Sequence, residues 1–342
     1  MNSFALYRLP HAKTFTLVEG PVETFLSCAQ LNGRRGFVVA PFEVSTEQPI
    51  VLITPKRIAF DTMPVMPQLP ETTLLSGSSR STYAIDFANF HAQLLKGTFR
   101  KIVLARCVDE TLPEDLTPVE LFLRACNRYP RLFISLFYTP QSGMWLTATP
   151  EILLDCENGM CRTIALAGTM RLEGKELEGE GENVRWSIKN VQEQRYVATY
   201  MAECLEHVTS DFREDGPRTV RAAHLVHLRS DFTFTLPDND HIGDVLSRLH
   251  PTPAVCGLPK RESFQFIVNN EHTPRRYYSG FMGMLDPSGD THLYVALRCM
   301  NIERGSCHLY AGGGLLPDSV EEQEWQETEA KLDTMRNIIY NV

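Results

Sequence analysis

Several features that define membrane, secreted or nucleic-acid-binding proteins are absent from this 342-residue sequence. No apolar run approaches the roughly 20 residues that a membrane-spanning helix needs, and residues 1–13 lack the sustained apolar core of a signal peptide. No basic block is present and the net charge is −9, which makes nucleic acids and anionic membranes poor partners. No internal repeat or low-complexity segment appears. We therefore expect a soluble, cytoplasmic protein.

The nine cysteines include no Cys-x-x-Cys pair, and their number is odd. This usage is typical of a reduced intracellular chain in which cysteines serve as small buried hydrophobic residues. Cys156 and Cys161 flank Asn158-Gly159, a hairpin signal, and are expected to lie close together on neighbouring strands. A zinc site there would require two further ligands, and we find none in the sequence.

The apolar content, in contrast, is ample for a large core, since 43% of the residues are hydrophobic and 22% are charged. Hairpin-type joints dominate the connections between the short apolar runs, so the sequence predicts an α+β domain with large antiparallel sheets and helices outside. Helices are predicted at 83–96, 117–129, about 182–208, 242–249 and from 324 to the end. Strands are predicted at 36–40, 50–53, 101–106, 132–138, 144–147, 152–156, 161–167, 278–285, 293–302 and 307–311. One further strand is predicted between the helices at 182–208 and 242–249, and a surface linker is predicted at 75–79.

The C-terminal segment carries a chemical signal. Residues 311–315 are glycine-rich and lead into an acidic helix, on which Glu324, Glu327 and Lys331 share one face. Two carboxylates beside backbone amides that can approach an anion suit a metal ion and a carboxylate substrate. A merely solvated acidic helix face gives the same pattern, so these residues alone do not decide.

Nine short motifs occur in one order along the chain. They are Lys-Ile-Val-Leu-Ala-Arg (101–106), Ala-Thr-Pro-Glu (148–151), Ala-Leu-Ala-Gly-Thr (165–169), Val-His-Leu (226–228), His-Pro-Thr-Pro-Ala (250–254), Tyr-Tyr-Ser-Gly-Phe-Met-Gly (277–283), Ala-Leu-Arg-Cys (296–299), Ala-Gly-Gly-Gly (311–314) and Glu-Trp-Gln-Glu-Thr-Glu-Ala-Lys (324–331). In this order they resemble the chorismate-binding enzymes, a group that includes isochorismate, salicylate, anthranilate and aminodeoxychorismate synthases. The resemblance implies the fold of that group, with large antiparallel sheets packed together. We predict a single domain of residues 1–342, with a variable N-terminal part (1–82) and a chorismate-binding core (83–342).

Three positions discriminate within this group. The resemblance implies that Lys101 is the lysine that activates water in isochorismate and salicylate synthases. Ala167 stands where aminodeoxychorismate synthases have a lysine that attacks chorismate covalently. Ala254 stands where enzymes that go on to eliminate pyruvate usually have threonine. Together these residues favour isochorismate synthase.

The implied reaction adds water at C2 of chorismate while the C4 hydroxyl leaves, so it needs a base and an acid. Resemblance assigns Lys101 as the base and Glu151 as the acid, and Glu151 must then stay protonated in an apolar or anionic setting. Without the resemblance, Lys101 reads as a surface lysine at the start of a strand. Glu151, in the same reading, caps a turn after Pro150.

The resemblance also implies a Mg²⁺ ion that takes the ring carboxylate of the substrate. Glu193 and Glu327 are the implied direct ligands, and Glu324 would hold a coordinated water. The fourth position of the family falls on Asn190, where an acid is common. A neutral amide can still accept a hydrogen bond from water, but the site loses one charge, so we expect weaker metal binding.

Arg298 and the Gly312 backbone amide are implied to bind the enolpyruvyl carboxylate, because guanidinium and amide donors match its geometry. Lys331 would add positive charge near the ring carboxylate. Ala254 and Leu297 are implied to line the substrate pocket.

Gly168 and Thr169 are implied to donate an amide and a hydroxyl hydrogen bond to the same anion. His227 is expected to hydrogen-bond the C4 side of the substrate, although a satisfied core histidine would look the same in sequence. Arg276, just before Tyr277-Tyr278, is a further candidate for a pocket cation.

From sequence we therefore predict a Mg²⁺-dependent isochorismate synthase that acts on chorismate as a monomer, without an obligatory protein partner, and we favour menaquinone biosynthesis as its pathway. A catecholate siderophore or salicylate route remains open. One alternative is a salicylate synthase, which shares the site and then eliminates pyruvate. A second is a catalytically silent chorismate-binding subunit, against which the retention of Lys101, Glu151, Glu193 and Glu327 argues.

Overall fold

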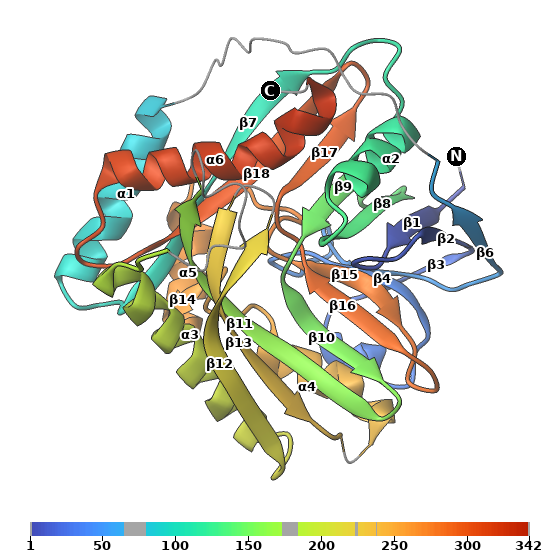
Figure 1. The fold of residues 1–342 in the computed structure, drawn as a ribbon, viewed down its shortest axis with the longest axis horizontal. Coiled ribbons are helices and arrows are strands. Elements are labelled where there is room, and N and C mark those ends of the chain that lie inside the picture. Colours follow the sequence, from blue (N-terminus) through green and yellow to red (C-terminus); the bar gives the residue numbers. More distant parts are fainter. Residues whose placement is uncertain (1, 65–79, 173–183, 223–224, 237, 341–342) are drawn as a thin grey trace.

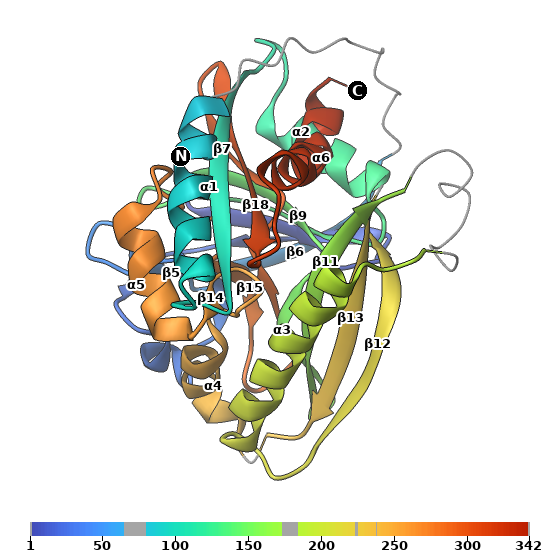
Figure 2. The ribbon, with the colours of Figure 1, turned by 90° about the vertical axis from the view of Figure 1, so that its left-hand side faces the viewer.

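Two nine-stranded antiparallel sheets pack face to face, with helices on their outer faces (Figures 1 and 2). The computed structural model describes residues 2–64, 80–172, 184–222, 225–236 and 238–340. The predicted α+β class, with large antiparallel sheets and helices outside, is confirmed.

The first sheet contains the strands that carry Lys101 and Gly312 of the predicted site. In spatial order its strands are β14 (Gly257–Leu258), β7 (Lys101–Thr111), β18 (Ser306–Leu315), β17 (Cys299–Glu303), β9 (Gly143–Thr149), β8 (Phe133–Thr139), β1 (Phe4–Arg8), β2 (Thr14–Glu19) and β6 (Arg57–Thr62). The second sheet runs β12 (Phe212–Ala222), β13 (Leu225–Phe234), β11 (Met160–Arg171), β10 (Ile152–Glu157), β16 (Thr291–Val295), β15 (Phe281–Leu285), β4 (Gly36–Ala40), β5 (Ile50–Ile53) and β3 (Val22–Phe25). Aromatic side chains fill the space between the sheets, and the rings of Phe133 on β8 and Tyr294 on β16 stack with their centroids 4.2 Å apart.

The helices cover the outer faces of the sheets. They are α1 (Arg80–Leu95), α2 (Pro118–Arg128), α3 (Ile188–Glu206), α4 (Ile242–Leu249), α5 (Lys260–Asn270) and α6 (Glu321–Ile339), with short 3-10 turns at Cys28–Leu31 and Asn239–His241. Helices α2 and α6 bury apolar residues against the first sheet, and α3 and α4 against the second. Helices α1 and α5 flank β7 and β14 (Figure 2). Helix α2 begins as predicted, because the Thr117 side chain accepts a hydrogen bond from the Glu120 N–H at 3.2 Å.

Two of the points at which the chain passes from one sheet to the other lie side by side. Between β9 and β10 it crosses at Pro150 and Glu151, and between β16 and β17 it crosses at residues 296–298. The Val295 N–H donates to the Glu151 carbonyl at 2.9 Å, and the Ala148 N–H donates to the Arg298 carbonyl at 3.0 Å. These hydrogen bonds hold Glu151 and Arg298 at one place in the fold.

Some predicted elements differ from the structure. The single strand predicted at 293–302 is wrong, since β16 and β17 are separate strands in different sheets. Helix α5 and strands β1, β2, β3 and β6 were not predicted, and the region between α3 and α4 forms two strands rather than one. Helix α3 starts at Ile188, where Ser187 accepts a hydrogen bond from the Asn190 N–H. Residues 182–183 of the predicted helix and 75–79 of a predicted linker lie outside the described residues.

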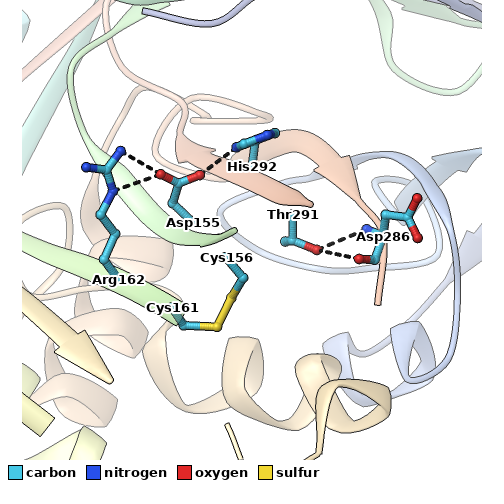
Figure 3. Close-up of a disulfide and its surroundings, with 7 residues drawn as sticks. All are labelled: Asp155, Cys156, Cys161, Arg162, Asp286, Thr291 and His292. Atoms are coloured by element: carbon cyan, nitrogen blue, oxygen red, sulfur yellow. Dashed lines mark hydrogen bonds and ion pairs between the residues drawn. A yellow bond between two sulfur atoms is a disulfide. The ribbon is translucent and has the colours of Figure 1, made fainter. Parts of the chain in front are cut away.

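Cys156 and Cys161 lie opposite each other on β10 and β11, as predicted, and they form a disulfide (Figure 3). The expectation of a fully reduced chain is therefore wrong for this pair, because directly opposed strand positions bring the two Cα atoms within 4.0 Å. The other seven cysteines are free, and all except the half-buried Cys107 are buried, as expected for small hydrophobic residues. Beside the disulfide, Asp155 accepts hydrogen bonds from Arg162 and His292 (Figure 3).

Membrane-spanning helices were not expected from the sequence. Over the residues that the structure describes, no helix is long and apolar enough to cross a membrane.

Candidate active site

A cavity lies where β7 and β18 approach β11 and β13. Ten sequence-predicted residues line it: Glu151, Gly168, Thr169, Glu193, His227, Ala254, Leu297, Arg298, Gly312 and Lys331. A second hollow adjoins the cavity at Thr169 and is lined by Asn190, Glu324 and Glu327 as well as Lys189. The structure thus brings these predicted residues into one region from three strands, two strand junctions, the loop after α4 and two helices.

Lys101 is the first residue of β7 and is completely buried. Its Nζ donates to the Pro253 carbonyl at 2.9 Å and lies 3.1 Å from Glu193 Oε1. Glu193 lines the cavity, whereas Lys101 itself does not. Pro253 precedes Ala254, so the ammonium links β7 to the segment that lines the pocket. The alternative of a surface lysine is wrong, because no part of this side chain reaches solvent.

Glu151 occupies the crossing between β9 and β10 and is 3% exposed. Burial raises the pKa of its carboxyl to about 7, although the nearby charges of Arg298 and Lys101 act in the opposite direction. A large fraction of Glu151 is therefore protonated at neutral pH. This is the state in which a carboxyl can donate a proton to a leaving group.

Arg298 lies at the second crossing, with φ +44°, and is buried. Its Nη2 donates to His227 Nε2 at 2.8 Å, which fixes His227 as the tautomer with its proton on Nδ1. The other terminal nitrogen, Arg298 Nη1, is buried without a hydrogen-bond partner in the described part of the chain. A buried guanidinium nitrogen that lacks an acceptor is suited to an anionic ligand.

His227 orients Arg298 by accepting its hydrogen bond. Burial, reinforced by the positive charge of Arg298, keeps the pKa of His227 well below its usual value, so the ring is neutral. Its Nδ1–H points toward the Gly168 carbonyl at 3.2 Å. Both ring nitrogens therefore have protein partners, and the contact to the C4 side of a substrate stays a prediction.

At two glycines the backbone lies so close to a neighbouring residue that a side chain would not fit. Gly168 forms a bulge in β11 with φ +72°, and a Cβ there would lie 3.1 Å from the Asn190 Cβ. A Cβ on Gly312 would lie 2.7 Å from Tyr278 Oη.

Three carboxylates from two helices converge over the glycines of β18. A Cβ on Gly314 would lie 2.1 Å from Glu193 Oε1, and a Cβ on Gly313 would lie 3.3 Å from Glu324 Oε2 and 3.8 Å from Glu327 Oε1. Glu324 is 1% exposed, and its Oε2 has no hydrogen-bond partner among the described residues. This space, bounded by carboxylate oxygens and free of side chains from the strand, fits a hard divalent cation.

The two carboxylates on α6 differ in their ionisation. Burial raises the pKa of Glu324 to about 7, and the negative charge of Glu327 adds to this effect. Burial also opposes ionisation of Glu327, but Lys331 and Lys189 hold its pKa below the usual range. Lys331 Nζ lies 2.6 Å from Glu327 Oε1 and donates to the Gly312 carbonyl at 2.8 Å. An α6 lysine thus connects the carboxylate cluster to the glycine strand.

Comparison with known proteins agrees with this geometry. A family model described as chorismate binding enzyme matches residues 62–340. The chain belongs to the chorismate-binding enzyme family.

Among its relatives in the family, isochorismate synthase EntC of Escherichia coli (strain K12) is 30% identical over 243 residues, which cover 70% of this chain and 62% of that protein. Isochorismate synthase MenF of the same organism is 30% identical over 250 residues, which cover 72% of this chain and 57% of that protein. The chain therefore matches about three fifths of the length of these relatives.

Solved structures show the same fold. The putative 2,3-dihydroxybenzoate-specific isochorismate synthase DhbC from Bacillus anthracis superposes with a TM-score of 0.86 at 22% identity, covering 100% of this chain and 97% of that chain. Anthranilate synthase component I from Streptococcus pneumoniae superposes with a TM-score of 0.70 at 17% identity, covering 93% and 80% of the two chains. At these identities the likeness establishes the shared architecture.

Within this chorismate-binding fold, Arg276 does not line the cavity. Its Nη1 donates to Asn301 Oδ1 at 2.8 Å, and its guanidinium lies over the Trp145 ring. Arg276 instead borders a separate hollow beside Phe42 and Pro274. The proposal of Arg276 as a pocket cation is therefore wrong for this cavity.

One residue of the site was missed in the sequence. Lys189 lies in the first turn of α3, and its ammonium pairs with Glu324 of α6. The signal was available, because Lys189 stands four residues before Glu193 and adjoins Asn190, so all three are close on one helix. Its pairing with α6 depends on the tertiary fold.

Proposed function

We propose that this protein is an isochorismate synthase that converts chorismate to isochorismate. The main support is a buried, readily protonated glutamate and a guanidinium nitrogen without a partner among the described residues, both at one cavity, together with a buried lysine that contacts the cavity-lining Glu193. Lys101, Glu151 and Arg298 are the residues concerned. Relatives named isochorismate synthases in the same family support the same activity.

The reaction balances as a rearrangement. The oxygen of a water forms a bond to C2 of the ring, the ring double bonds shift, and the C4–oxygen bond breaks. In this proposal Lys101 acts in its neutral amine form and accepts a proton from the attacking water, and Glu151 gives a proton to the departing C4 hydroxyl, which leaves as water. One water enters and one leaves, so the product is an isomer of the substrate.

Substrate binding is proposed to use the positive groups around the cavity. Arg298 Nη1 and the Gly312 amide would receive the enolpyruvyl carboxylate, while Lys331 faces the ring carboxylate. The neutral His227 orients Arg298 through the 2.8 Å hydrogen bond and so keeps the free nitrogen directed at the ligand. Gly168 and Thr169 provide further donors at the cavity wall.

Mg²⁺ is proposed as the cofactor, with Glu193 and Glu327 as direct ligands and Glu324 and Asn190 holding coordinated water. The carboxylate oxygens that converge beside Gly313 and Gly314 support this assignment. When bound, the ion would supply positive charge to the ring carboxylate of the substrate. The chain itself contributes three carboxylates and one amide to this site.

Pocket composition favours isochorismate as the released product. Ala254 and Ala167 line the cavity with methyl groups, so Ala167 offers no nucleophile and Ala254 offers no hydroxyl to fold the enolpyruvyl arm over the ring. A salicylate synthase would release pyruvate as well, which product analysis detects. A silent subunit would give neither product.

For the pathway, menaquinone biosynthesis is our proposal. Relatives include the menaquinone-type MenF and also a vibriobactin-specific isochorismate synthase of Vibrio cholerae, which is 24% identical over 312 residues covering 87% of this chain and 78% of that protein. Deletion of the gene should lower cellular menaquinone. Normal menaquinone with loss of a secreted catecholate would overturn this assignment.

The activity is tested by incubating the purified chain with chorismate and Mg²⁺ and identifying the products by chromatography. Isochorismate without stoichiometric pyruvate is the expected result. Salicylate with equimolar pyruvate would favour the salicylate synthase alternative, and unchanged chorismate would favour the silent subunit.

A further inference from the structure

Lys189 is a charged residue at the site for which the proposed reaction has no use. Its side chain is 18% exposed, projects from the first turn of α3, and pairs with the almost fully buried Glu324 of α6. Burial disfavours its charge, but the charges of Glu324, Glu327 and Glu193 together raise the pKa of Lys189 above its usual value. The ammonium thus lies in the field of all three carboxylates.

The three carboxylates and three lysines of the site form matched pairs. Lys101 pairs with Glu193 at 3.1 Å, Lys331 pairs with Glu327 at 2.6 Å, and Lys189 pairs with Glu324. Among these six side chains the formal charges sum to zero when all are ionised. Asn190 contributes no charge at the position where the family often has an acid.

This balance affects a divalent cation that enters alone. The cation shares its carboxylates with ammonium groups, and like charges at such short range repel each other strongly inside a protein. A dicarboxylate ligand brings two negative charges and offsets the added charge of the ion. Metal and dianion should therefore favour each other's binding, and such coupling is reciprocal.

Of the three lysines, only Lys189 is free of a proposed role in catalysis or substrate binding. It borders the outer hollow with Asn190, Glu324 and Glu327 rather than the substrate cavity. Its charge can consequently be changed without removal of a group that touches the substrate.

Building on the proposed function, we propose that Lys189 is a resident counter-cation of the carboxylate cluster. It lowers the affinity of the free protein for Mg²⁺ and makes Mg²⁺ and the dicarboxylate substrate bind cooperatively. Lys189 pairs with Oε1 of Glu324. The other carboxylate oxygen, Oε2, is buried without a partner among the described residues and can accept the ion or its water.

Calorimetric titration of Mg²⁺ into the substrate-free protein tests the first part. Wild type is compared with Lys189→Met and Lys189→Gln, which remove the charge, and with Lys189→Arg, which keeps it. Titration at pH 8.5, well above the usual pKa of a carboxyl group, favours ionised carboxylates in every variant. We expect Mg²⁺ to bind the two neutral variants at least about tenfold more tightly than wild type, and Lys189→Arg to resemble wild type.

The second part is tested in a Glu151→Gln background, in which chorismate is expected not to turn over. The ratio of Mg²⁺ dissociation constants without and with chorismate should be large with Lys189 and should fall by about tenfold with Lys189→Met, because coupling is reciprocal.

Equal, weaker or undetectable Mg²⁺ binding by both folded neutral variants would overturn the proposal and leave Lys189 as a positioning residue for Glu324. Circular dichroism and thermal unfolding identify which variants are folded. These titrations involve no turnover, so their outcome does not depend on whether the protein is an isochorismate synthase. If wild type forms isochorismate but the neutral variants bind Mg²⁺ with unaltered affinity, the counter-cation role is refuted and the proposed function still stands.

Discussion

Burial of Glu151 is the residue-level feature with the most direct consequence for pH. A general acid works only while protonated, and burial raises the pKa of this carboxyl to about 7. As pH rises through 7 the proton is lost, so kcat/KM, which reports the ionisations of the free enzyme, should decline on the alkaline side and approach a tenfold loss per pH unit well above pH 7. A pH profile of kcat/KM checks this expectation.

Glu151→Gln provides the control for that profile. It keeps the size of the side chain but cannot donate a proton, so kcat/KM should drop by roughly 10²–10⁴ and lose the alkaline decline assigned to this group. An unchanged decline in Glu151→Gln would assign the ionisation to another residue.

The methyl group of Ala254 bears on product specificity. Isochorismate can lose pyruvate by a pericyclic hydrogen transfer if its enolpyruvyl arm folds over the ring, and pocket shape decides whether that conformer forms. Threonine adds a branch and a hydroxyl at this half-buried cavity position. Ala254→Thr should therefore gain measurable salicylate and pyruvate formation, quantified by chromatography. Ala254→Val, which adds the branch without the hydroxyl, separates the two contributions, and a Thr variant as free of salicylate as wild type would refute the idea.

At the residue scale, sequence motifs located most of the site in advance. Glu151, Arg298 and Gly312 stand in short contiguous motifs, and these motifs do meet at the cavity. The pairing of Lys189 with Glu324 and the tautomer of His227 could not be predicted from such motifs, because each depends on a partner distant in sequence. Arg276 shows the opposite error, since proximity to a motif in sequence did not bring its side chain to the cavity.

At the scale of elements, the described part of the chain offers no partner strand for one edge of β7 beyond Ile102. Strand β14 pairs with Lys101 and Ile102, and side chains of the segment that follows α5 continue the ladder. Arg275 Nη2 donates to the Val103 carbonyl at 2.9 Å, and Glu271 Oε1 accepts the Ala105 N–H at 2.7 Å. Arg275 Nη1 also donates to the Val255 carbonyl, next to the substrate pocket. This buried ion pair therefore helps to fix the strand that carries the proposed base.

Removal of Arg275 should be costly, because it leaves the Glu271 carboxylate buried and unpaired. The two groups lie 2.6 Å apart with only 3% and 2% of their side chains exposed. Arg275→Met is expected to lower the free energy of unfolding by about 3–5 kcal/mol in urea denaturation. Arg261→Met, at an exposed position on α5, is the matched control and should change it by less than about 0.5 kcal/mol. A similarly small effect at Arg275 would show that the pair does not support β7.

Element boundaries were predictable where local chemistry defines them. Thr117 and Pro118 mark the start of α2 in the sequence, and the structure agrees. The break between β16 and β17 was not predictable from a mainly apolar segment, because the change of sheet is imposed by tertiary packing. Helix α5 was missed for a similar reason, since only Ser263 and Ile267 of it are buried and its apolar residues show no clear helical stripe.

At the scale of the whole molecule, both sheets cooperate to build the site. Glu151 and Arg298 sit where the chain changes sheet, Lys101 and Gly312 come from the first sheet, and Gly168 and His227 come from the second. Helices α3 and α6 lie in the two outer layers (Figure 2), and their carboxylates converge beside the glycines of β18. The predicted fold class anticipated the layers, but not that the site would lie at the passages between them.

The N-terminal part is integral to this architecture. Strands β1, β2 and β6 extend the first sheet, and β3, β4 and β5 extend the second, although most of these residues precede the matched family region that begins at residue 62. Sequence motifs gave little information about this part, because its strands contribute packing rather than chemistry. The expected monomeric state stays a prediction.

The most direct test of the proposed function uses the chain alone, with chorismate and Mg²⁺, followed by chromatographic identification and quantification of the products. Wild type and Lys96→Ala, an exposed lysine variant, should produce isochorismate at equal rates. Lys101→Ala should lose roughly 10²–10⁴ in rate while chorismate binding changes only a few-fold, because the lysine acts mainly in proton transfer. A Lys101→Ala protein that forms isochorismate at the wild-type rate, or a wild type that leaves chorismate unchanged, would contradict the mechanism.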